Sequence, residues 1–107
     1  MATPWFADIA NYLVQGVIPD DFNYNQRKRF LSQVKAFFWD DPYLFKVCGD
    51  GVIRRCVLET EIPSILHHCH SLACGGHYGV HRTAAKVLEA GFYWRTLNKD
   101  CQEFVSL

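Results

Sequence analysis

The chain has 107 residues with eleven basic and eleven acidic side chains, so its formal net charge is zero. Half of the residues are hydrophobic and 15% are aromatic, which indicates a globular domain and excludes a disordered chain. Zero net charge argues against a protein held to nucleic acid by its overall charge. No apolar run approaches the roughly 20 residues that span a bilayer. Five cysteines without a signal peptide predict reduced thiols in a nuclear or cytoplasmic protein that is not secreted.

Two helices are predicted at the start of the chain. Thr3-Pro4 begins the first, because threonine is a good N-cap and proline fits the first turn, and Gly16 ends it. Asn23 and Gln26 are spaced as in a capping box, which predicts a second helix. The apolar residues of that helix recur at helical spacing: Phe30, Leu31, Val34, Phe37 and Phe38.

A β-hairpin is predicted next. Asp40-Asp41-Pro42 is expected to end the second helix, because the residue before a proline disfavours helix. Residues 43–48 and 52–57 are rich in β-formers and are joined through Gly49-Asp50-Gly51. Asp-Gly between two such runs is a strong hairpin signal.

Three short helices are predicted in the rest of the chain. Thr60 caps the first, which buries a stripe of Ile62, Ile65, Leu66 and Cys69. The second runs from about Val80 to Gly91, and Thr96 caps the third after the aromatic Phe92-Tyr93-Trp94. We therefore expect an α+β fold of mostly short helices with one β-hairpin. Its domains would be residues 1–58, with the N-terminal helices and the hairpin, and residues 59–107, a small helical zinc-finger-like region.

Residues 67–81 hold all five histidines and two of the five cysteines. Imidazole and thiolate are the usual zinc ligands. His70 and His77, with two glycines between them, could close on a metal, but two histidines are half of a tetrahedral site. Cys74 in the loop and Cys101 on the last helix are possible extra ligands. The alternative is hydrogen-bonded loop histidines without metal, with the cysteines as small apolar residues.

Several segments resemble a known family: Ile65 to His70, Gly75-Gly76-His77-Tyr78-Gly79, Arg82-Thr83-Ala84 and Gly91-Phe92-Tyr93-Trp94. They are similar to the zinc-binding N-terminal region of integrases from gypsy-type LTR retrotransposons, particularly those of plants. The resemblance continues upstream and covers nearly the whole chain. It implies an HHCC zinc site in which His70 and His77 are the two histidines. The Cys-x-x-Cys pair follows after roughly thirty residues in the family. It would begin just after Leu107, so we expect a truncated site with weak or absent Zn²⁺ binding.

The resemblance implies a non-catalytic fragment of an integrase, whose parent polyprotein would carry integrase and reverse transcriptase activities. Such a domain supports assembly with other integrase protomers and binds the DNA ends of the element. Four basic residues on the short helices are candidate DNA contacts: Arg82, Lys86, Arg95 and Lys99. Because the net charge is zero, we expect weak and salt-sensitive DNA binding by this chain alone. We expect no membrane and no small-molecule substrate.

The sequence also bears on two other functions. A zinc-dependent hydrolase needs a carboxylate base near the metal, but no acid lies between Glu61 and Glu89 and no His-Glu-x-x-His motif is present. This argues against catalysis. A degenerate genomic relic, or a helical interaction module without bound metal, is the alternative to the integrase fragment.

Overall fold

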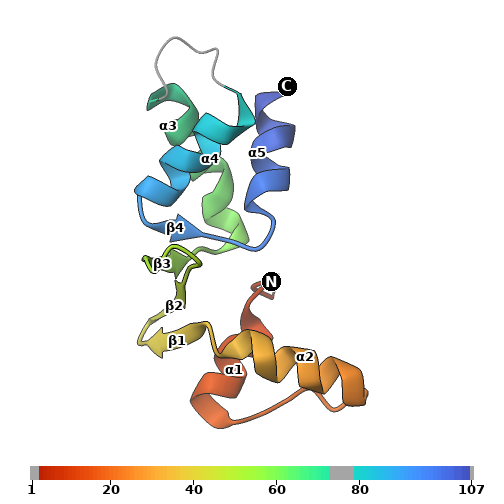
Figure 1. Ribbon diagram of the computed structural model, residues 1–107. Coiled ribbons are helices and arrows are strands. Elements are labelled where there is room, and N and C mark those ends of the chain that lie inside the picture. Colours follow the sequence, from red (N-terminus) through yellow and green to blue (C-terminus); the bar gives the residue numbers. More distant parts are fainter. Residues whose placement is uncertain (1–2, 73–78, 107) are drawn as a thin grey trace. The chain divides into compact units, whose positions relative to one another are not determined.

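The computed structural model describes residues 3–72 and 79–106 of the chain (Figure 1). The described residues form five α-helices and four β-strands, which confirms the predicted α+β class. The chain divides into two compact units, residues 1–56 and residues 57–107. The domain boundary that the sequence suggested after residue 58 stays a prediction.

Two helices lie in the first unit, as predicted, but the predicted start of the first at Thr3-Pro4 was wrong. The Pro4 carbonyl accepts a turn hydrogen bond from the Ala7 N–H, and the helix begins only at Ala7, with Phe6 as its N-cap. Helix α1 (Ala7–Gln15) ends at Gly16, whose φ of 72° is a left-handed conformation that glycine adopts without strain. Helix α2 (Tyr24–Val34) begins with a complete capping box: the Asn23 side chain accepts from the Gln26 backbone N–H at 2.9 Å, and the Gln26 side chain accepts from the Asn23 N–H at 2.9 Å. The Phe30 ring of α2 packs edge-to-face on Tyr12 of α1.

The predicted C-terminal end of the second helix was wrong. Helix α2 stops at Val34, and strand β1 (Phe37–Asp40) follows. Phe37 is buried whereas Phe38 is partly exposed, which is the alternation of a strand rather than a helical stripe. The Phe38 ring stacks on Phe45 of the neighbouring strand, so cross-strand pairing overrides the helical spacing. Asp41 and Pro42 therefore join two strands and do not end a helix.

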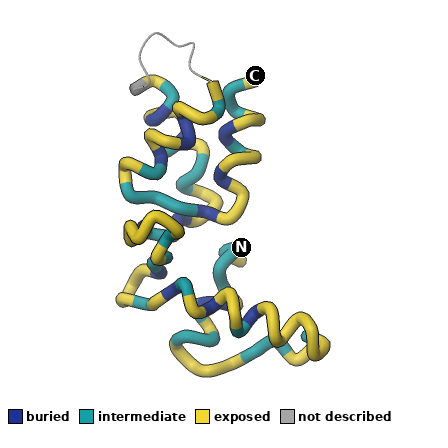
Figure 2. The backbone as a smooth tube through the Cα atoms, viewed as in Figure 1, coloured by how far each residue is buried: buried dark blue, intermediate teal, exposed yellow. Residues whose placement is uncertain are grey.

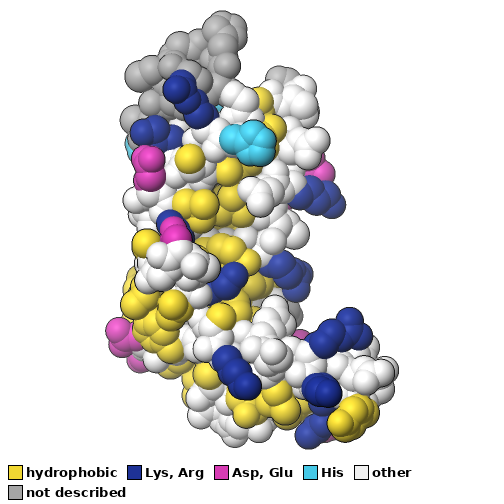
Figure 3. All heavy atoms as spheres, in the orientation of Figure 1, with side chains coloured by type: hydrophobic (Ala, Val, Ile, Leu, Met, Phe, Trp, Pro, Cys, Tyr) yellow, Lys and Arg dark blue, Asp and Glu magenta, His cyan; other side chains and the backbone are white. Residues whose placement is uncertain are grey.

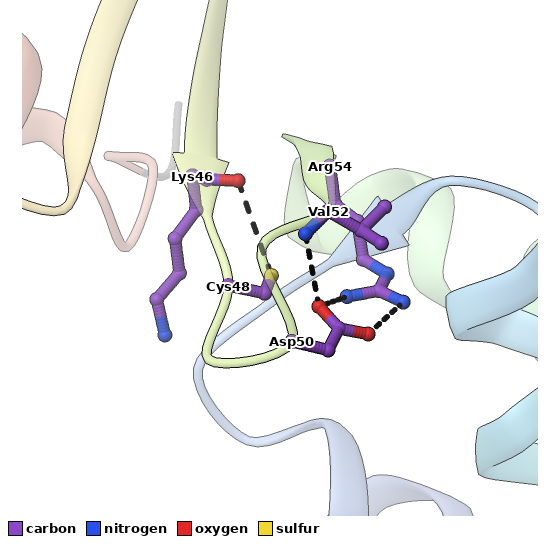
Figure 4. A network of polar contacts seen from close by, with 5 residues as sticks. All are labelled: Lys46, Cys48, Asp50, Val52 and Arg54. Carbon is purple, nitrogen blue, oxygen red and sulfur yellow. Dashed lines mark hydrogen bonds and ion pairs between the residues drawn. The ribbon is translucent and has the colours of Figure 1, made fainter.

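The predicted hairpin is confirmed as part of a larger antiparallel sheet. Strand β2 (Tyr43–Val47) lies between β1 and β3 (Ile53–Cys56). At the β2–β3 turn, the Asp50 carboxylate accepts a hydrogen bond from the Val52 N–H at 3.1 Å and two from the Arg54 guanidinium at 3.0 Å each (Figure 4). The hydrogen bonds from Arg54 and Val52 hold the pKa of Asp50 below its usual value. This carboxylate therefore fixes both the turn and the buried Arg54.

The second unit is a cluster of helices. A short 3₁₀ turn (Glu59–Glu61) leads into α3 (Ile62–Leu72), and α4 (Val80–Glu89) packs against both α3 and α5 (Leu97–Val105). Between α4 and α5, the strand β4 (Phe92–Tyr93) accepts a hydrogen bond at the Tyr93 carbonyl from the Val57 N–H. The three helices are confirmed, but the predicted cap at Thr60 was wrong, because Thr60 lies inside the 3₁₀ turn that precedes α3.

The core of the second unit lies between its three helices, where the buried segments of Figure 2 face one another. Its most buried members come from the three helices and from the segments that flank them: Val57, Leu66, Cys69, Thr83, Val87, Trp94 and Cys101. Threonine is the one polar residue among them. The longest helices in the described ranges have eleven residues, and none of the described helices is long and apolar enough to cross a membrane.

Candidate metal centre

His70 lies in the last turn of α3 and is held by the two neighbouring helices. Its Nδ1 is 3.4 Å from the Thr83 hydroxyl oxygen of α4. Its ring also packs edge-to-face on Phe104 of α5, with ring centroids 5.6 Å apart. A histidine that binds a metal through one ring nitrogen usually hydrogen-bonds through the other. Because Nδ1 faces Thr83, the arrangement of His70 is compatible with metal binding through Nε2, and its role as a zinc ligand stays a prediction.

The other residues of the predicted site are not assembled by the described part of the chain. His77 and Cys74 lie outside the described residues, so their pairing with His70 stays a prediction. In residues 3–72 and 79–106, no three His, Cys, Asp or Glu side chains gather where they could hold a metal ion. The printed sequence also contains no Cys-x-x-Cys. The described residues therefore contain one of the predicted ligands, His70, and its role in a zinc site stays a prediction.

Cys101 is a fully buried thiol in the core beside α3. Burial raises its pKa to about 11, and the nearby Asp100 carboxylate and Cys69 act in the same direction. Burial likewise raises the pKa of Cys69, which is also in the core. Zinc binds the thiolate, and these thiols are protonated at neutral pH without a metal. Both pack as small apolar residues, and the role of Cys101 as an extra ligand stays a prediction.

Sequence reasoning missed the two residues that hold His70. Thr83 is fully buried and Phe104 half-buried, and both come from helices that follow His70 in the chain. The signal that could have identified Thr83 was a polar β-branched residue on the apolar face of α4, beside Ala84 and Val87. A hydroxyl in such a position requires a hydrogen-bonding partner.

The four candidate DNA-contacting residues are all exposed. Arg82 and Lys86 lie on α4, Arg95 follows β4, and Lys99 lies in the first turn of α5. Lys86 forms an exposed ion pair with Glu89 at 3.3 Å, which reduces the local positive charge. Figure 3 shows basic side chains at both edges of this helical unit. Their role in binding DNA stays a prediction.

The family follows from comparison with known proteins. Residues 57–107 match the family described as integrase zinc binding domain. This part of the chain belongs to that family. The chain is also 31% identical over 83 residues to "Gypsy retrotransposon integrase-like protein 1" of Mus musculus, a match that covers 76% of this chain and 16% of the mouse protein. No solved structure matches the chain.

The integrase zinc-binding domain spans the second compact unit, which contains α3, α4 and α5. The resemblance to the zinc-binding region of gypsy-type integrases is therefore confirmed. The family implies Zn²⁺ binding. The roles of His70 and His77 in holding the ion stay predictions.

Proposed function

We propose that this chain acts as a non-catalytic zinc-binding module of a gypsy-type integrase. In this role it supports assembly with other integrase protomers and binds the DNA ends of the element in the nucleus or cytoplasm. The observation that carries the proposal is His70, held where α3, α4 and α5 of a zinc-binding family domain meet.

His70 and His77 are the residues that would hold the metal. Bound zinc would cross-link α3 to the segment that precedes α4 and add binding free energy to folding. Thr83 and Phe104 position the His70 ring from the other two helices. Two imidazoles supply half of a tetrahedral donor set, so we expect weak binding by these residues alone.

Zinc analysis of the purified chain, combined with melting curves, tests the metal site. We expect EDTA to lower the Tm only slightly, because two histidines bind zinc weakly. The variants His70→Ala and His77→Ala should show the same Tm with and without EDTA. A large loss of Tm with EDTA in the wild type, absent in His77→Ala, would show that further ligands complete the shell. Cys74→Ala and Cys101→Ala would then identify them.

DNA binding is tested by fluorescence anisotropy with a labelled duplex of the element's terminal sequence. We expect Lys86→Glu and Lys99→Glu each to weaken binding for all duplex sequences. Each should also reduce the slope of log affinity against log salt by about one, because one phosphate contact is lost. Lys28→Glu is the matched control, because Lys28 is an exposed base on α2 in the other unit. Loss of binding in Lys28→Glu with no change in the other two variants would place the DNA contact on α2 instead.

A metal-free helical interaction module is the second candidate. It is favoured by the absence, among the residues described, of any group of three potential ligands. Native mass spectrometry with added Zn²⁺ distinguishes the two. The zinc-binding module acquires one ion that His70→Ala loses, whereas the metal-free module acquires none.

A further inference from the structure

The buried hydroxyl of Thr83 needs an explanation that packing does not give. Thr83 is fully buried in the helical core next to Ala84 and Val87, where valine would fill a similar volume. Threonine is a weaker helix former than alanine, and a hydroxyl removed from water costs free energy unless it is hydrogen-bonded. No buried side-chain oxygen or nitrogen in the described residues lacks a partner. In that part of the chain, the side-chain partner of Thr83 is Nδ1 of His70.

The contact between Thr83 and His70 joins two helices and involves one nitrogen, Nδ1, of the imidazole ring. Thr83 on α4 and His70 on α3 are thirteen residues apart, so their contact is tertiary and not a local cap. The Phe104 ring approaches the same imidazole at an interplanar angle of 79° and restricts its rotation. A hydroxyl both donates and accepts, so it pairs with Nδ1 whether or not that nitrogen carries a proton. In the neutral ring with its one N–H on Nδ1, Nε2 has a free lone pair for a metal.

We infer that Thr83 is the positioning residue of His70: its hydroxyl holds Nδ1 and so presents Nε2 as the ligating nitrogen. The orientation of the ring is a property of the metal-free chain. Its consequence for zinc rests on the proposed function. Two experiments therefore test the role of Thr83, and only one of them uses metal.

The first test uses the full chain without metal. Ring ¹⁵N spectra of the histidines and nuclear Overhauser contacts between His70 and Phe104 are compared in the wild type, Thr83→Val and Thr83→Ser. We expect Thr83→Val to lose the Phe104 contact and to move the His70 signals toward those of the exposed His67 and His68. Thr83→Ser keeps the hydroxyl and should retain the wild-type pattern.

Thr96→Val is the matched control, since it removes a threonine hydroxyl that bonds Asp100 and not a histidine. It should leave His70 unchanged. A folded Thr83→Val with wild-type His70 signals would overturn the inference. If Thr83→Val fails to fold, Thr83→Ala takes its place in the same spectra, and a folded Thr83→Ala with wild-type His70 signals also overturns the inference.

The second test measures Zn²⁺ affinity by competition with a chromophoric chelator. We expect Thr83→Val to bind zinc about 10- to 100-fold more weakly, as for other residues that support a metal ligand, and Thr83→Ser and Thr96→Val to match the wild type. Equal affinity of Thr83→Val and the wild type contradicts the inference while the zinc-binding function stands. If the wild type binds no zinc, the proposed function fails, and the metal-free spectra alone support or overturn the role of Thr83.

Discussion

At the scale of single residues, Asp100 connects the aromatic segment after β4 to helix α5. Its Oδ2 accepts a hydrogen bond from the Trp94 indole N–H at 2.8 Å and another from the Thr96 hydroxyl at 2.8 Å. Trp94 is only 1% exposed, so its N–H has little access to water. The carboxylate also lies in the first turn of α5, where negative charge is favourable to the helix dipole.

We expect Asp100→Ala to lower the free energy of unfolding by about 1–3 kcal/mol, because it leaves the buried Trp94 N–H without its acceptor. Urea denaturation measures the loss. In a double-mutant cycle, Trp94→Phe combined with Asp100→Ala should cost less than the sum of the single changes. Additive losses would show that the indole hydrogen bond contributes nothing.

Because of Cys101, we expect the free energy of unfolding to depend on pH in the alkaline range. Burial raises its pKa in the folded chain to about 11, from an ordinary value of 9.0. Between these values the unfolded chain loses the thiol proton and the folded chain keeps it, so the free energy of unfolding falls as pH rises from about 9 to about 11. At about 1.4 kcal/mol per pKa unit, the loss reaches about 3 kcal/mol. Urea titrations across this range should show a flatter pH dependence for Cys101→Ala; an equal slope refutes the assignment to this thiol.

At the scale of elements, Gly91 makes the turn between α4 and β4. Its φ is 91°, a conformation that side-chain-bearing residues rarely adopt, and a Cβ there would meet no atom within 4 Å. We expect Gly91→Ala to lower the free energy of unfolding by about 1–2 kcal/mol through backbone strain alone. Thermal melting of Gly49→Ala provides the control, because Gly49 has equal space and no positive φ. If the two substitutions lower the Tm equally, backbone strain at Gly91 is not the cause.

Local signals predicted most of these elements. The Asn23–Gln26 capping box, Gly16 and the Asp-Gly turn act through neighbouring residues, so the sequence alone reveals them. Strand β1 was missed because Phe37 and Phe38 continue a helical spacing, and only their partners on β2 make them a strand. His70 was predicted as a ligand from the resemblance to the integrase family, but its supports on α4 and α5 depend on helix packing, which spacing does not encode.

At the scale of the whole molecule, opposite charges cancel in number but are not evenly distributed. Residues 23–39 carry four bases and no acid, although the net charge of the chain is zero. Zero net charge removes long-range attraction to DNA, so binding depends on local contacts. The four exposed bases after residue 80 are the proposed contacts.

We therefore expect duplex affinity to fall steeply with salt. Four phosphate contacts give a slope of about −3 to −4 in a plot of log affinity against log salt, or about 10²-fold between about 50 and 200 mM. Anisotropy titrations at several salt concentrations measure this slope. An affinity unchanged over that range would exclude phosphate contacts as the basis of binding.

The Asp50 carboxylate at the β2–β3 turn also bears on how the chain reaches its fold. All of its hydrogen bonds go to residues within four positions along the chain. Loops this short close with little loss of chain entropy, and hairpins form in about 1–10 μs. The contact between His70 and Thr83 joins residues thirteen positions apart and requires α3 and α4 to dock first. The hairpin can therefore form before α3 and α4 dock, and we expect the contacts around His70 to form after the turn at Asp50.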